Sequence, residues 1–197
     1  MATTDPAPVR LPRAQRREQI LAAATQAFAR AGFAATSLDD VAVEAGITRV
    51  ILYRHFDSKT DLYQAVLDRV CALLATHVAE QVGEFTDASI DGLLAAAAAD
   101  PAGFRLLFRH AAREPEFKAQ ADRFRTEIHD IAHLQIKAYV ADPAWARWAS
   151  QLTPTVAIES VLAWLDAGQP DPARAAHRIR AAIGGVTAAA AQSTPTA

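Results

Sequence analysis

The sequence contains few of the residues that cross-link or interrupt a chain. A single cysteine, Cys71, stands among 197 residues, so an intramolecular disulfide is excluded and a reducing compartment is favoured. The 8 glycines and 10 prolines fall mainly between long segments with helical periodicity. Alternating, β-branched runs bounded by turn residues are missing as well. The chain is therefore predicted to be all-α.

Long hydrophobic runs are also absent, although 51% of the residues are hydrophobic. No apolar run approaches the roughly 20 residues that a membrane span requires. No hydrophobic stretch precedes the first charges, so we expect no secretion signal and predict a cytoplasmic protein with no membrane partner. Residues 1–12 are expected to form a disordered arm, and residues 193–197 a frayed tail.

Net charge gives only a weak indication of partners. The formal net charge is −2, but residues 1–60 carry eight Lys/Arg against six acids, which leaves −4 for the remainder. A slightly basic amino-terminal region followed by a mildly acidic remainder is compatible with nucleic-acid binding but does not establish it.

A short segment near the amino end has an unusual composition. Residues 46–59, GITRVILYRHFDSK, place two arginines, a tyrosine and a histidine on one short helix. The preceding helix begins at Thr36 or Ser37 as cap and stops at Gly46, where a positive φ costs little. Two short helices joined in this way fit a helix-turn-helix. We therefore predict a DNA-binding domain over 13–60 and a helical body over 61–192.

The apolar spacing separates an inner from an outer face of this motif. Val41, Ala42, Ile47 and Leu52 are expected to pack on Ile20, Ala24 and Phe28 of the first helix, which should end at Gly32. The residues left for a DNA groove are Thr48, Arg49, Val50, Tyr53 and Arg54. Arg54 is equally compatible with a solvated charge.

The body should contain five further helices after one over 58–83. Proline and glycine positions predict them at 87–99, 101–113, 114–141, 143–168 and 171–192, with about nine helices in the whole chain. Pro154 lies inside the fourth of these and is expected to kink or split it near Leu152–Thr153.

The segment TSLDDVAVEAGITRVILYRHFDSKTDLY resembles the DNA-binding domain of the TetR/AcrR family of bacterial transcription regulators. The match runs from about Arg13 to Val70, and DPAGFRLLFRHAAREPEF is similar to a segment common in the family's ligand-binding domain. The residues that carry the first match are Phe28, Gly32, Thr36, Val41, Ala42, Ala45, Gly46, Leu52, Tyr53, Phe56, Ser58 and Lys59.

The resemblance implies roles for individual residues. Tyr53, His55 and Lys59 would bind backbone phosphates, whereas Thr48, Arg49 and Val50 would face the bases. Arg49 is the best candidate for a bidentate contact to guanine, worth about 1–3 kcal/mol of discrimination. Thr36 and Ser37 complete the predicted DNA-contacting set. Arg13, Arg16 and Arg17 form either a basic arm on the DNA or a solvated run.

Large side chains are plentiful in the body, which suggests an apolar ligand pocket between helices, although each of them is also compatible with plain core. His129 and His133 are four residues apart, but no third metal ligand has suitable spacing, so neither a metal nor a cofactor is predicted. No catalytic constellation is evident, and we predict no enzyme. The predicted ligand-binding residues are Phe104, Phe108, His110, Phe124, Ile128, His129, Trp148 and Trp164, with Arg105 and His133 as further polar candidates.

The resemblance also implies a homodimer formed by the last two helices, over 150–168 and 171–192. Their small residues, including Gly184 and Gly185, would allow close approach, although this glycine pair is also compatible with a helix end. The predicted function is a ligand-responsive repressor that binds palindromic DNA half-sites and is released by a small hydrophobic effector. The alternatives are an activator of the same family, or an all-α small-molecule-binding protein or enzyme with a degenerate helix-turn-helix.

Overall fold

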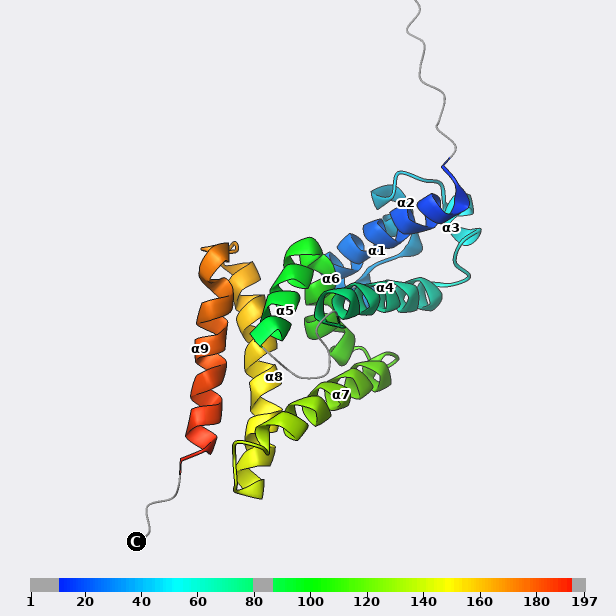
Figure 1. The fold of residues 1–197 in the computed structure, drawn as a ribbon. Helices are drawn as coiled ribbons and strands as arrows, with labels where there is room; N and C mark the ends of the chain where they lie inside the picture. Colours follow the sequence, from blue (N-terminus) through cyan, green and yellow to red (C-terminus); the bar gives the residue numbers. More distant parts are fainter. Residues whose placement is uncertain (1–10, 80–86, 193–197) are drawn as a thin grey trace, which may run out of the picture. The chain divides into compact units, whose positions relative to one another are not determined.

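The computed structural model describes residues 11–79 and 87–192, which belong to two compact units, Met1–Val66 and Leu67–Ala197. Within the described ranges it contains nine α-helices and no strand (Figure 1), so the all-α prediction is confirmed. The chain divides after Val66, whereas the sequence placed the boundary after residue 60. The predicted arm at 1–12 and tail at 193–197 lie almost wholly outside the described residues.

The first unit contains α1 (Arg13–Ala35), α2 (Leu38–Glu44), α3 (Arg49–Tyr53) and the start of α4 (Lys59–Ala79). The predicted break at Gly32 is present, because this residue has φ 79° within α1, although helical residues continue to Ala35. The left-handed φ explains why glycine stands there. The predicted extension of α4 beyond Ala79 falls outside the described residues.

An apolar core holds the first unit together. Ile20, Ala24 and Phe28 of α1 are completely buried, as are Val41 and Leu52 of the two shorter helices, as predicted; Ile47 is half-buried. The ring of Tyr63 meets that of Phe28 edge-on at 4.9 Å. The amide of Gln19 donates to the Ala45 carbonyl at 2.8 Å, which ties α1 to the turn between α2 and α3.

Helix starts in this unit follow local capping chemistry. Ser37 caps α2: its hydroxyl accepts the Asp40 N–H at 3.1 Å, and the Asp40 carboxylate accepts the Ser37 N–H at 2.8 Å. Ser58 precedes α4, and its hydroxyl accepts the Asp61 N–H at 3.0 Å. Both caps satisfy N–H groups that a helix start leaves without partners.

The second unit contains α5 (Asp87–Ala99), α6 (Pro101–Arg105), α7 (Lys118–Ile136), α8 (Pro143–Asp166) and α9 (Pro172–Ala190). A π-helical turn (Leu106–His110) and a 3-10 turn (Ala111–Arg113) follow α6, so the predicted helix 101–113 changes its hydrogen-bond pattern twice. Helix α8 packs against α7 and α9, and α5 packs against α8 and α9. The long α8 is thus the centre of this unit (Figure 1).

Two expectations about these helices need correction, and one alternative is excluded. The helix predicted over 114–141 starts at Lys118, because Pro115 lies in the turn before it rather than in the first helical turn. Pro154 does not split α8, which remains helical from Pro143 to Asp166. Both Thr153 and Pro154 are buried, and α8 packs against α7 and α9. This packing offsets the one backbone hydrogen bond that Pro154 cannot donate. Helix α9 continues through Gly184 and Gly185, so these glycines do not end it.

None of the described helices combines the length and the apolar character needed to cross a membrane. Within the same residues, no cluster of three or more His, Cys, Asp or Glu side chains is placed to hold a metal ion.

Candidate nucleic-acid interface

Helix α3 presents its side chains to solvent on one face and anchors itself with the other. Gly46 turns the chain with φ 63°, and Thr48 caps α3 through its hydroxyl, which accepts the Ile51 N–H at 3.4 Å. Leu52 is fully buried, whereas the exposed fractions of Val50 and Tyr53 are 63% and 43%. A valine this exposed on a short helix has no role in the core of the unit.

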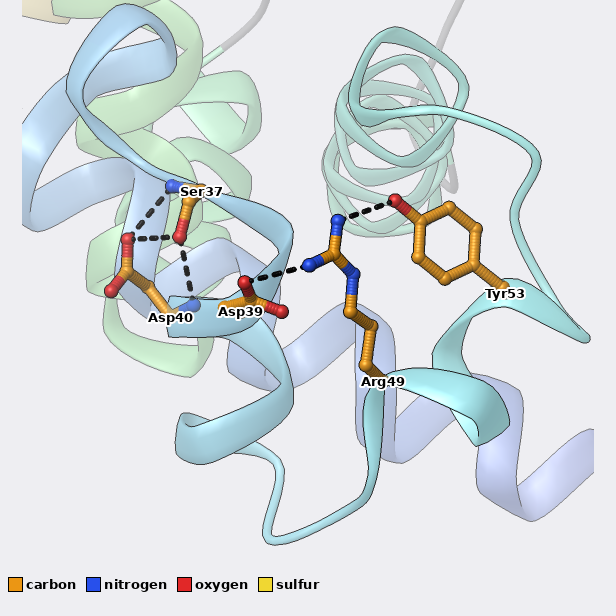
Figure 2. A network of polar contacts seen from close by, with 5 residues as sticks. All are labelled: Ser37, Asp39, Asp40, Arg49 and Tyr53. Atoms are coloured by element: carbon orange, nitrogen blue, oxygen red, sulfur yellow. Dashed lines mark hydrogen bonds and ion pairs between the residues drawn. The ribbon is translucent and has the colours of Figure 1, made fainter.

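Arg49 lies at the centre of a polar network between α2 and α3 (Figure 2). Its guanidinium donates to the Asp39 carboxylate at 3.0 Å and to the Tyr53 hydroxyl at 3.2 Å. The guanidinium carbon also lies 5.4 Å from the centre of the Tyr53 ring. The hydrogen bond to Tyr53, followed by the charge of Asp39, raises the pKa of Arg49. The predicted base-reading arginine is thus held in one orientation by one residue on each helix.

The two predicted contact residues before α2 have internal hydrogen-bond partners. Thr36 is 3% exposed, and its hydroxyl donates to the Gly32 carbonyl at 2.7 Å, so its side chain faces the core of the unit. Ser37 is exposed, but its hydroxyl also donates to the Asp40 carboxylate at 2.6 Å (Figure 2). These bonds to Ser37 lower the pKa of Asp40. Both residues fix the start of α2.

A basic cluster surrounds the end of α3. Partial burial lowers the pKa of His55, and the nearby charges of Arg13, Arg17 and Arg16 lower it further. The guanidinium of Arg17 lies 5.0 Å from the centre of the Phe56 ring. The sequence left the role of these arginines open; the fold places them close enough to His55 to form one positive surface. Arg54 is exposed at the end of α3.

Lys59, a predicted phosphate ligand, is engaged with the end of α1. Its ammonium donates to the carbonyls of Phe33 at 2.8 Å and Ala34 at 3.3 Å. It also lies 4.4 Å from the centre of the Phe33 ring. Because an ammonium has three N–H groups, one donor remains for a further partner.

Asp39 is the residue of this interface that the sequence did not indicate. Acidic residues are common in the first turn of a helix because the helix dipole favours them there, so Asp39 has no distinctive signal in the sequence. The pairing with Arg49, ten residues away, depends on the angle between two helices and has no signature in the spacing of residues.

The predicted ligand-binding residues occupy several places in the second unit. Phe104 is buried with its ring centre 4.6 Å from that of Phe108, and it lines a cavity of only about 10 Å³. Trp148 is 39% exposed and meets Trp145 edge-on at 5.5 Å. Trp164 donates to the Pro170 carbonyl at 2.9 Å and lines a groove of about 550 Å³ between α8 and α9.

The remaining predicted residues are more scattered. His110 lies in the π-helical turn, and Ile128 and His129 are half-buried on α7. Phe124 is also on α7, but its side chain is outside the description. The two further polar candidates have protein partners: Arg105 pairs with Asp166 at 3.1 Å, and a ring nitrogen of His133 lies 3.0 Å from the Ser150 hydroxyl.

A separate cleft of about 530 Å³ opens between α5, α7, α8 and α9. Its wall is mainly aliphatic, and none of the eight predicted ligand-binding residues belongs to the lining among the side chains that the structure describes. The lining residues are Ile90, Ala132, Gln135, Ile136, Tyr139, Val140, Thr153, Arg180, Ile183, Gly184, Thr187, Ala188 and Ala191.

The segment that contains this interface also matches known proteins. Residues 20–66 match the family model of bacterial regulatory proteins of the tetR family. The HTH-type transcriptional activator FasR of Mycolicibacterium smegmatis is 36% identical over 118 residues, which are 56% of this chain and 54% of that protein. The regulator TtgR of Pseudomonas putida is 50% identical over 52 residues, 26% of this chain and 25% of that protein. The matched region thus spans about half or less of these curated relatives.

The fold likeness extends over most of the chain. A TetR-like transcriptional regulator from Rhodococcus sp. RHA1 superposes with a TM-score of 0.78 at 21% identity, covering 91% of this chain and 99% of that chain. At this level of identity the likeness establishes the fold, and the DNA-binding segment carries the closer sequence match.

Proposed function

Because the chain belongs to the TetR/AcrR family of bacterial transcriptional regulators, we propose that it binds operator DNA as a homodimer and represses transcription until a small effector releases it. The family consists of regulators and not of enzymes. The observation that carries the proposal is the exposed face of α3, where Arg49 is held in place by Asp39 and Tyr53.

The exposed positions of α3 suit two kinds of DNA contact, one with bases and one with phosphates. Thr48, Arg49 and Val50, at its amino end, would face base edges in the major groove. Arg49 would bind guanine through two parallel N–H donors, and the exposed Val50 would contact a thymine methyl group.

Phosphate contacts would come from the margins of the helix. Tyr53, His55 and the remaining donor of Lys59 would bind phosphates together with the arginines at the start of α1. Arg54, exposed at the helix end, would add a further charge. Thr36 and Ser37 would position α2, because their hydroxyl groups already have partners within the unit.

Dimerisation would use the outer faces of α8 and α9. Ala163 on α8 and Ala182 and Gly185 on α9 are exposed, and a Cβ atom added at Gly185 would meet no atom within 4 Å. Small residues let the helices of a second copy approach closely. Pairing would present two α3 helices to half-sites roughly 34–36 Å apart, which accounts for the predicted palindromic operator.

The effector would act by favouring a dimer that does not fit these half-sites. Such a shift requires tighter binding to the form that is incompetent for DNA. Helix α4 is a candidate connection, because its residues up to Val66 belong to the first unit and those from Leu67 to the second.

Selection of binding sites from random duplex DNA at 0.1 M salt tests the proposal. We expect an enriched palindrome, and Arg49→Ala should lose the preference at one base pair in each half-site while retaining the others. Absence of any enriched sequence would contradict the proposal and favour a binding protein with a degenerate helix-turn-helix.

Activation of transcription is a second candidate, favoured by the FasR relative, which is named an activator. It would use the same DNA contacts. A reporter gene under the selected operator separates the two, since deletion of the regulator raises expression for a repressor and lowers it for an activator.

A further inference from the structure

The cleft between α5, α7, α8 and α9 contains polar atoms without partners. Thr153 lines the cleft and is 3% exposed, yet its hydroxyl makes no hydrogen bond within the structure. The side-chain nitrogen of Gln135, on the facing helix α7, is buried at the same cleft and likewise has no partner. Buried polar groups are costly when unpaired, so two at one cavity indicate a missing partner.

Thr153 differs from its neighbours on α8 in this respect. The hydroxyl of Ser150 donates to the carbonyl of Ala146 at 2.6 Å, and that of Thr155 donates to the carbonyl of Gln151 at 2.9 Å. A helical serine or threonine normally finds such a carbonyl one turn back. The hydroxyl of Thr153 has no such bond, so its hydrogen-bonding capacity is not used within the described structure.

The charges around the cleft favour an uncharged occupant. Among the described lining residues, Arg180 is the only ionised side chain, and it forms an ion pair with Asp91. The remaining wall is mostly aliphatic. A hydroxyl and an amide N–H₂ group both donate hydrogen bonds, so the matching ligand group is an oxygen acceptor such as a carbonyl.

Helix geometry separates this cleft from the proposed dimer surface. The cleft residues of α9 include Arg180, Gly184 and Thr187, which recur at the spacing of one helical stripe. Ala182 and Gly185, assigned above to the dimer surface, lie on a different stripe. A step of two residues, as from Arg180 to Ala182, turns roughly 200° around the axis, almost to the opposite side of the helix. Occupation of the cleft is therefore compatible with dimerisation.

From these observations we propose that the cleft is the effector site and binds an uncharged, largely apolar molecule whose carbonyl oxygen accepts hydrogen bonds from Thr153 and Gln135. The assignment of an effector role rests on the proposed function, whereas the binding site itself does not. It replaces the aromatic set predicted from the sequence, whose described members do not line this cleft.

A matched pair of probes tests the chemistry. Equilibrium dialysis of the full chain would compare 2-acetylnaphthalene with 2-ethylnaphthalene, which has the same ring system without the carbonyl. We expect the ketone to bind about tenfold more tightly. Thr153→Val, which replaces the hydroxyl with a methyl group, should reduce this preference to about twofold while the hydrocarbon binds as before.

Two small residues of α9 provide a matched pair of variants for the location. A Cβ at Gly184 would stand in open space, Ala173 is exposed near the start of the helix, and leucine is a good helix former, so both leucine variants should fold. Gly184→Leu fills the cleft and should weaken ketone binding at least tenfold. Ala173→Leu lies outside both the lining and the proposed dimer surface and should leave ketone binding unchanged.

The melting temperature of the ligand-free protein tests whether the Thr153 hydroxyl lacks a partner. If the Thr153 hydroxyl is unpaired, Thr153→Val should leave the melting temperature unchanged or raise it. A fall of more than about 3 °C would show that the hydroxyl has a partner in the protein and would overturn the proposal.

The proposal would also be overturned if the wild-type chain did not bind the ketone, or if Gly184→Leu bound it as tightly as the wild type. If instead the ketone binds through Thr153 but no DNA sequence is selected, the site stands and the proposed function fails.

Discussion

The guanidinium of Arg49 lies 3.0 Å from the Asp39 carboxylate, so the residue proposed to read a base is already paired in the free protein. Both side chains are 58% exposed, and water screens their attraction. The pair therefore orients Arg49 without holding it tightly, and a guanine can take the place of Asp39.

Asp39→Asn should strengthen binding to all DNA sequences. The change removes a negative charge from the DNA-facing side and weakens the competition for Arg49. We expect a two- to fivefold gain in affinity at 0.1 M salt, roughly the strength of an exposed ion pair, measured by fluorescence anisotropy. Asp57→Asn, which also removes an exposed carboxylate, is the matched control. Weaker binding by Asp39→Asn would mean that Asp39 itself contacts the DNA.

Lys59→Met should destabilise the first unit as well as weaken DNA binding. The methionine keeps an apolar chain near Phe33 but loses the two hydrogen bonds to carbonyl groups and the contact of the ammonium with the ring. We expect a loss of about 1–2 kcal/mol in the free energy of unfolding, measured by urea denaturation. An unchanged free energy of unfolding would show that the ammonium is free for DNA in solution.

DNA affinity should rise as the pH falls toward the pKa of His55. Partial burial and the neighbouring arginines lower the pKa of His55 below its ordinary value of 6.5 in the free protein. A phosphate beside the ring favours the charged form and raises this pKa, so binding takes up a proton between the two values. Titration of affinity between pH 5.5 and pH 8 checks this; His55→Gln should remove its share of the dependence.

The same pKa shift affects stability with the opposite sign. The unfolded chain takes up the His55 proton more readily than the free folded protein, so the free energy of unfolding should decrease as the pH falls below 6.5. Well above pH 6.5 the ring is neutral in both the folded and the unfolded state, so His55 then causes no loss of stability. The free energy of unfolding, measured by urea denaturation at a series of pH values, should therefore depend on pH more steeply for the wild type than for His55→Gln only below about pH 6.5.

Ala182→Glu should separate the proposed dimer and weaken operator binding. Ala182 is exposed on α9, away from the cleft, and a carboxylate there would be desolvated at a helix–helix contact. Sedimentation at micromolar concentration should show monomers, and affinity for a full palindrome should fall to that for a half-site. Ala173→Glu, near the start of the same helix and also exposed, is the control. A dimeric Ala182→Glu protein would place the interface elsewhere.

The sequence was sufficient for features that depend on neighbouring residues. The starts of α2, α6, α8 and α9 were predicted from Ser37, Pro101, Pro143 and Pro172, because capping and a missing N–H act within one helical turn. The inner face of the helix-turn-helix followed from apolar periodicity in the same way. The split expected at Pro154 is absent because packing of α8 against α7 and α9 offsets its local cost, and these contacts join residues that are far apart in the chain.

What the sequence alone determined is the all-α fold, the helix-turn-helix and the outward face of α3, since each follows from local spacing. Only the tertiary structure decided that Asp39 pairs with Arg49, that Lys59 binds the end of α1, and that Thr153 and Gln135 share one cleft. Each of these depends on the angle and distance between helices. Packing of many side chains together sets those quantities, and no short stretch of residues encodes them.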